Sequence, residues 1–147
     1  MEKELINQLY NNRLLRNRQE IEKFEEGLDM ASEAIQEDDI SELCSIFDDN
    51  TMDDEVMFGL VHLIEIFSSE KAFKSTVLGI GKMIKISPYW ARIIIYRCLN
   101  DDFSRKMLKN AIDNADTDLK QKIKLLLYDI KNEDYDKFGA LIDEIME

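Results

Sequence analysis

Apolar residues recur at helical spacing along almost the whole chain, and this periodicity is the feature that most constrains the fold. The chain has 147 residues but only five glycines and one proline, too few for the turns of a β-rich domain. The spacing therefore predicts an all-α protein. The predicted helices cover residues 2–16, 19–37, 39–48, 53–67, 69–85, 88–99, 102–114, 117–131 and 134–146.

The predicted helices begin at regular intervals, and each pair of them takes roughly thirty residues, the length of an αα-hairpin repeat. We therefore predict a single helical domain over residues 1–147. Its expected architecture is a curved stack of antiparallel helical hairpins, a short and irregular HEAT-like α-solenoid of eight or nine helices. A four-helix bundle fits less well, because the helices are too many and too short.

Capping signals mark several of the predicted helix starts. Thr51 and Asp54 form a variant of the capping box, in which two side chains satisfy free N–H groups. Asp39 is a further expected N-cap. Ser87 precedes Pro88, which suits the first position of a helix because that position needs no N–H donor.

The charge is distributed unevenly along the chain. Residues 24–70 hold fifteen acidic side chains and no lysine or arginine, and the whole chain has a net charge of −12. This balance argues against nucleic acid as a partner and against docking on an anionic membrane, because both need cationic side chains. It favours a partner with a basic surface.

Two cysteines, Cys44 and Cys98, lie within apolar helical patterns. They are expected to be buried free thiols in a reducing compartment, since a disulfide framework has more cysteines at closer spacing. The first eighteen residues contain no apolar signal-peptide core, and no apolar run is long enough to cross a membrane. We therefore expect a cytoplasmic protein.

No motif for a metal ion, a cofactor or catalysis is recognisable. An EF-hand that starts at Asp48 or Asp49 needs glycine at its sixth position, where the chain has Asp53 or Asp54. A zinc helix needs two histidines, and His62 is the only one. The segment LGIGK (78–82) lacks the following Ser or Thr of a phosphate loop, so its glycines are expected at a tight helix crossing. We expect no enzyme, no metal and no cofactor.

The helix predicted over residues 53–67 has an apolar core side and a mixed polar and aromatic far side, a composition typical of protein interfaces. The later helices 88–99 and 117–131 also place aromatic residues away from their main apolar stripe. The alternative is that these aromatic residues pack in the core. The predicted partner-binding residues are Asp48, Asp49, Asp53, Asp54, Glu55, Phe58, His62, Glu65, Tyr89, Arg92, Tyr96 and Tyr128.

Two segments also resemble a known family. The stretch DDNTMDDEVMFGLVHLIEIF (48–67), then a helix, then PYWARIIIYRCLN (88–100), is similar to the small all-α immunity proteins of bacterial polymorphic toxin and contact-dependent inhibition systems. The resemblance covers about residues 39–130. Its matching positions are Glu55, Gly59, Leu60, His62, Leu63, Glu65, Trp90, Tyr96, Arg97 and Leu99.

The resemblance implies a cytoplasmic protein that binds and neutralises a cognate toxin domain and has no catalysis of its own. The acidic segment 24–70 fits this function, because an acidic inhibitor complements a basic toxin surface. One alternative is a helical-repeat adaptor or regulatory protein without a toxin partner. Another is an enzyme that uses His62, Glu65 and the aspartate cluster.

Overall fold

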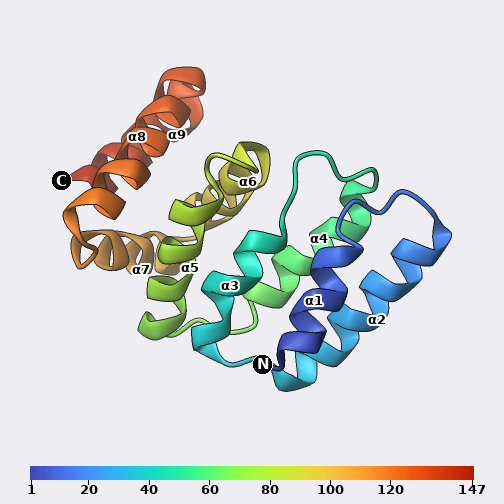
Figure 1. Ribbon diagram of the computed structural model, residues 1–147. Helices are drawn as coiled ribbons and strands as arrows, with labels where there is room; N and C mark the ends of the chain where they lie inside the picture. The colour runs from blue at the N-terminus through green and yellow to red at the C-terminus, as the bar shows by residue number, and fades with distance from the viewer.

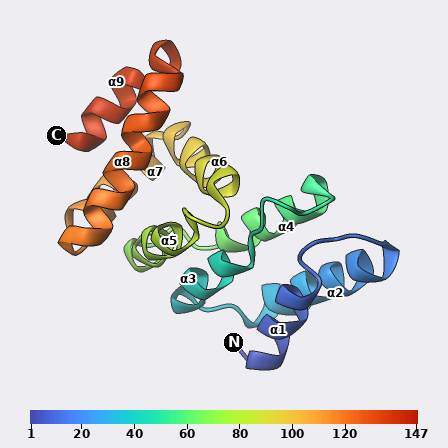
Figure 2. The ribbon, with the colours of Figure 1, turned by 45° about the horizontal axis from the view of Figure 1, so that its top comes forward.

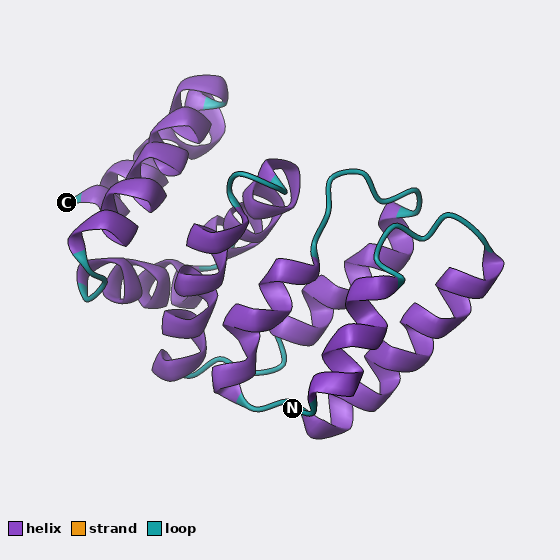
Figure 3. Cartoon of the chain, viewed as in Figure 1, coloured by secondary structure: helices purple, strands orange, loops and turns teal.

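The computed structural model describes all residues, 1–147, as helices joined by short loops without any β-strand (Figure 3). The all-α class and the number of helices are therefore confirmed. The α-helices are α1 (Lys3–Asn11), α2 (Arg18–Ala34), α3 (Ile40–Leu43), α4 (Asp54–Ile64), α5 (Glu70–Met83), α6 (Pro88–Leu99), α7 (Asp102–Asp113), α8 (Thr117–Glu133) and α9 (Tyr135–Met146).

Helices that alternate along the chain pack against each other: α3 contacts α5, α5 contacts α7, and α2 contacts α4. Figures 1 and 2 show this succession from the α1–α2 pair at one end to the α8–α9 pair at the other. A stack of helical hairpins produces such contacts between every second helix. The HEAT-like stack itself stays an interpretation of these contacts. One hydrophobic cluster of 37 buried residues runs from Leu5 to Ile145.

Two predicted helices differ strongly from the structure, and the helices predicted over 19–37 and 53–67 end three residues early, at Ala34 and Ile64. The helix predicted over 39–48 is only one α-turn, α3, between the 3₁₀ segments Glu37–Asp39 and Cys44–Ile46. Phe47 has an extended backbone, with φ of −57° and ψ of 138°, and therefore ends the helical turns; both Ile46 and Phe47 are buried. The first helix ends at Asn11 rather than at residue 16, because the chain turns through Leu15, which is buried and has a φ of 50°.

The glycines of LGIGK lie at close approaches between helices, as predicted. A Cβ atom on Gly79 would lie 2.5 Å from the Cys44 sulfur and 3.2 Å from the Ser41 Cα atom. A Cβ atom on Gly81 would meet only the end of the Leu119 side chain in α8, which can move aside. Glycine at position 79 therefore allows α5 to pack closely on Ser41 and Cys44.

Both cysteines are buried and free, as predicted. Burial raises the pKa of the Cys44 thiol and of the Cys98 thiol to about 12. No helix combines the length and the apolar character that crossing a membrane requires.

Candidate functional site

Helix α4 carries the central part of the predicted binding surface. Asp53 caps it, since the Asp53 carboxylate accepts a hydrogen bond from the Val56 N–H at 3.1 Å. The predicted capping box of Thr51 and Asp54 is therefore wrong, and the Thr51 hydroxyl is buried without a hydrogen-bond partner. The core side of α4 is apolar, whereas Glu55 and His62 are exposed on its far side.

The loop before α4 uses two of the predicted residues for internal contacts. Asp48 is 7% exposed, and its carboxylate accepts hydrogen bonds from the Arg13 guanidinium at 3.2 Å and from the Asn50 N–H at 2.8 Å. Asp49 accepts hydrogen bonds from the N–H groups of Tyr89 and Trp90 at 3.0 and 3.4 Å. Asp49 thus caps α6 from a position forty residues earlier in the chain.

This long-range cap corrects the expected start of α6. Pro88 occupies the first turn as predicted, but the Ser87 side chain makes no capping hydrogen bond. The Ser87 hydroxyl instead donates to the Met83 carbonyl oxygen at 3.2 Å. Asp39 likewise caps the 3₁₀ segment before α3 by accepting from the Gln36 N–H at 2.7 Å, and it makes no side-chain cap on α3 itself.

An aromatic cluster joins α4 to α6. Trp90 is fully buried, and its ring lies 5.6 Å from that of Phe47, 5.7 Å from that of Phe58 and 5.3 Å from that of Tyr89. Phe58 is half-buried and packs against the core, and its ring lies 5.9 Å from the His62 ring. Phe58 is thus partly exposed on the far side of α4, as predicted, and it also packs against the core, as the alternative predicted.

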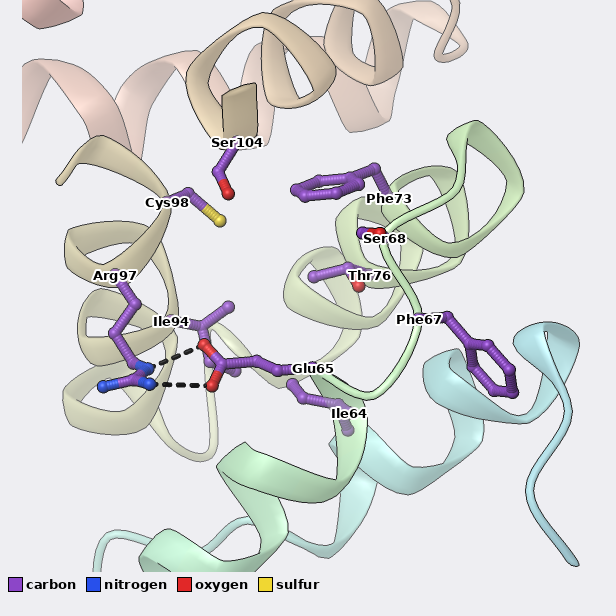
Figure 4. Close-up of a pocket in the computed structure, with 10 residues that line it drawn as sticks. All are labelled: Ile64, Glu65, Phe67, Ser68, Phe73, Thr76, Ile94, Arg97, Cys98 and Ser104. Atoms are coloured by element: carbon purple, nitrogen blue, oxygen red, sulfur yellow. Dashed lines mark hydrogen bonds and ion pairs between the residues drawn. The ribbon is translucent and has the colours of Figure 1, made fainter. Parts of the chain in front are cut away.

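Polar contacts hold the two ends of the α4–α6 pair. The Tyr89 hydroxyl donates to the Asp54 carboxylate at 3.3 Å, near the start of both helices. Arg97 donates two hydrogen bonds to Glu65, at 2.6 and 2.8 Å, near the end of both (Figure 4). The two helices therefore run side by side in the same direction. Planar two-point pairing of this kind is specific to arginine.

These contacts also shift the pKa values of Arg97 and Tyr89. The hydrogen bonds to Glu65 raise the pKa of Arg97 above its ordinary value. Partial burial and then the negative charge of Asp54 raise the pKa of Tyr89. Tyr89 and Arg97 thus keep their protons and act as donors at neutral pH.

A small pocket opens beside the Glu65–Arg97 pair. It has a volume of about 200 Å³ and lies between the α4–α5 loop and helices α5, α6 and α7 (Figure 4). Its wall combines apolar side chains, such as Ile64, Phe73 and Ile94, with the hydroxyl groups of Ser68, Thr76 and Ser104. The Glu65 carboxylate pairs with Arg97, and the hydrogen bond from Glu65 to His62 is a backbone one, from the Glu65 N–H to the His62 carbonyl oxygen at 3.2 Å.

The remaining predicted residues belong to the C-terminal part of the molecule. Arg92 donates to the Glu133 carboxylate at 2.6 Å, and the Tyr96 ring stacks on Phe138 with 5.2 Å between ring centres. Tyr128 is 52% exposed on α8, which Figures 1 and 2 place on the far side of α6 from α4. The structure thus gathers the predicted residues between α4 and α6 but directs Arg92 and Tyr96 of α6 towards α8 and α9, and it leaves Tyr128 apart.

Sequence reasoning missed the outward face of α2, which packs beside α4. Its residues are exposed, and their spacing of three or four places them on one side of the helix. We name this set the α2 carboxylate stripe: Glu22, Glu25, Glu26, Asp29 and Glu33. Only Glu22 has an ion-pair partner, Arg18 at 3.0 Å. The signal was present in the sequence as a helical spacing of acidic residues.

A comparison with known protein families identifies the family of this chain. The family model of immunity protein 30 (Imm30) matches residues 11–108. The chain belongs to the immunity protein 30 family. No curated protein and no solved structure matches it.

Membership in the immunity protein 30 family confirms the resemblance that was based on helices 53–67 and 88–99. The matched residues include α2 through α6 and end within α7. They therefore contain both the α2 carboxylate stripe and the α4–α6 pair. Helices α8 and α9 lie outside the matched residues.

Proposed function

We propose that this immunity protein neutralises a cognate toxin domain by binding it in a stoichiometric complex. The observation that carries the proposal is the match of the immunity protein 30 family to residues 11–108, since the family suggests a toxin-neutralising role. Inhibition by binding needs a docking surface and no catalytic groups. The proposed complex forms in the cytoplasm, where the free thiols of Cys44 and Cys98 stay reduced.

The proposed docking surface is the acidic face, which we define as Glu25, Glu26, Asp29 and Glu33 of α2 with Glu55, Phe58 and His62 of α4. Its carboxylates are exposed and have no ion-pair partner within the chain. Their charges are therefore available to a basic toxin surface. Such complementarity mainly raises the association rate and selects the partner.

Phe58 and His62 supply the less polar part of this surface. Phe58 is supported from below by Trp90, and the Arg97 guanidinium lies 5.7 Å from the centre of its ring. A supported aromatic side chain loses little conformational freedom when a partner covers it. Asp54, Glu65 and Tyr89 lie along the edge of this surface and are proposed to contact the toxin at its rim.

The other predicted residues are proposed to contribute indirectly. Asp48, Asp49 and Asp53 fix the loop and the starts of α4 and α6, which sets the position of Phe58. Arg92 and Tyr96 hold the C-terminal hairpin against α6. A toxin with a basic surface meets the carboxylates of α2 first and Phe58 last, because charge acts at longer range than contact.

The test is co-expression of this chain with the protein encoded immediately upstream of its gene. We expect the chain to protect cells from that protein and to co-purify with it as a stoichiometric complex in size-exclusion chromatography with light scattering. Absence of both protection and complex would contradict the proposal. A complex with a protein that harms no cell would instead favour the helical-repeat adaptor.

A further inference from the structure

The outward side of α8 is uncharged, unlike the acidic outward sides of α2 and α4. Gln121, Leu125, Tyr128 and Asn132 are all exposed. Their spacing of four, three and four residues places them on one side of the helix, the spacing of a helix-pairing seam. Leu125 is 66% exposed and Tyr128 is 52% exposed. We name these four residues the α8 stripe.

No segment of the chain covers the α8 stripe. The opposite side of α8 is buried and carries Ile123, Leu126, Leu127 and Ile130. Beside the stripe, a shallow hollow of about 490 Å³ is lined by Gln121, Lys124, Leu125, Tyr128 and Met146. In two copies of the chain, the exposed Leu125 of each copy can therefore fill the hollow of the other.

The charges beside the stripe are ordered along the helix. Lys120, Lys122 and Lys124 lie in the first half of α8, where they outnumber the one carboxylate, Asp118, and none of the three lysines has an ion-pair partner. Asp129 lies in the second half, is exposed and is also unpaired. A helix with a basic first half and a free carboxylate in its second half complements a copy of itself that runs in the opposite direction.

We propose that two copies of this chain associate through their α8 stripes, antiparallel, about a twofold axis near Leu125. A twofold axis presents the same patch on both copies, so each contact occurs twice. Each Leu125 enters the hollow beside Tyr128 of the second copy. Lys122 and Asp129 are seven residues apart, so they lie on the same flank of the stripe. In an antiparallel pair, this flank of one helix lies against the same flank of the other helix. Lys122 of each copy therefore lies level with Asp129 of the other.

A second copy fits this surface better than the basic toxin does, because the surroundings of the stripe already carry free lysines. The contact also leaves α2 and α4 uncovered, so it is compatible with the acidic face as a separate docking surface. One helix buries little area, and small interfaces give weak association. The dimer is therefore expected to form in a concentration-dependent way, with a dissociation constant in the micromolar range or weaker.

Sedimentation equilibrium of the full chain over a wide concentration range tests the proposal. The wild-type chain shifts from monomer to dimer as its concentration rises. Leu125→Asp brings two carboxylates together at the axis and raises the dissociation constant at least tenfold, roughly the effect of losing one central apolar contact. Ile86→Asp is the matched control, since Ile86 is 68% exposed in the α5–α6 loop, and it leaves the dissociation constant unchanged.

A charge exchange separates this arrangement from other dimers. Lys122→Asp and Asp129→Lys each place like charges opposite one another and weaken the dimer several-fold, roughly the cost of an exposed like-charge pair. The double variant restores opposite charges and returns the dissociation constant to within about twofold of wild type. A monomer at every concentration, a dimer that Leu125→Asp leaves intact, or a double variant as weak as the single ones would each overturn the proposal.

Discussion

The two longest helices, α2 and α8, have the same length of 17 residues and lie near opposite ends of the molecule, but their outward faces differ in chemistry (Figure 1). The outward face of α2 carries five carboxylates, whereas that of α8 carries two amides, a leucine and a tyrosine. Both helices bury one side, α2 through Phe24, Gly27 and Ala31 and α8 through Ile123, Leu126, Leu127 and Ile130. The fold therefore needs only the inner faces, and the outer faces are free to serve different partners.

The difference matters because the two faces act over different distances. Carboxylates without counter-charges attract a basic protein over about 8 Å at physiological salt, before contact is made. An uncharged stripe stabilises a complex only after contact, through the apolar area that it buries. We therefore propose that α2 and α4 meet the toxin and that α8 serves self-association.

The largest effect is expected from reversing charge on α2. Glu25→Lys with Asp29→Lys should lower the association rate with the toxin by at least about tenfold at low salt, because steering acts through the summed local charge. Asp118→Lys with Glu147→Lys changes the net charge equally at the other end and should lower this rate less than about twofold. Stopped-flow association at two salt concentrations measures both. If both double variants lowered the association rate equally, the toxin would not be steered specifically by α2.

A smaller effect is expected from cutting the contact between the N-terminal part of the chain and α6. Asp49→Ala removes the acceptor for the Tyr89 and Trp90 N–H groups and should lower the free energy of unfolding by about 1 kcal/mol, the usual value of an N-cap. Asp49→Asn keeps an acceptor and should lose only part of this. Chemical denaturation measures both variants. If alanine and asparagine were equivalent, Asp49 would not act as a cap.

The smallest effects are expected from one ion pair near each end, with opposite pH dependence. Hydrogen bonds from Arg16 lower the pKa of Glu20, at the start of α2, from 4.5 to about 2. This contribution to stability is present above pH 4.5 and is lost as the pH falls towards about 2. The hydrogen bond to Asp143 raises the pKa of Lys131, in α8, above 10.5, so its contribution is present below pH 10.5 and is lost as the pH rises beyond it.

Melting temperatures across the pH range check this pair of predictions. Glu20→Gln should melt below wild type at neutral pH, and this difference should disappear in acid. Lys131→Met should also melt below wild type at neutral pH, and its difference should disappear in alkali. Differences that stay constant with pH would show that packing, and not charge, accounts for the two side chains.

The sequence was sufficient for what depends on local periodicity. The helix over 88–99 has the predicted bounds, and Gly79 lies at a close helix crossing as predicted. It was insufficient where residues distant in the chain meet. The cap of α6 comes from Asp49, forty residues earlier, and Glu65 pairs with Arg97 rather than lying free beside His62.

In the candidate surface too, features set by local periodicity could be predicted, and features set by distant contacts could not. The exposure of Glu55 and His62 follows from the period of one helix and could be read directly. The burial of Asp48 and the stacking of Tyr96 on Phe138 depend on Arg13 and on α9, which no local pattern relates to them. The α2 carboxylate stripe was readable from its spacing, but the packing of α2 beside α4 was not, because it joins residues distant in the chain.

The central claim is that the toxin docks on the acidic face of α2 and α4, and carboxylate labelling measures this most directly. The chain is treated with a carbodiimide and an amine, with and without the toxin domain, and each modified residue is found by peptide mass spectrometry. We expect the toxin to protect Glu25, Glu26, Asp29, Glu33 and Glu55, while Asp118 and Asp129 of α8 label equally in both samples. Protection of Asp118 and Asp129 with unchanged labelling of the α2 carboxylates would contradict it.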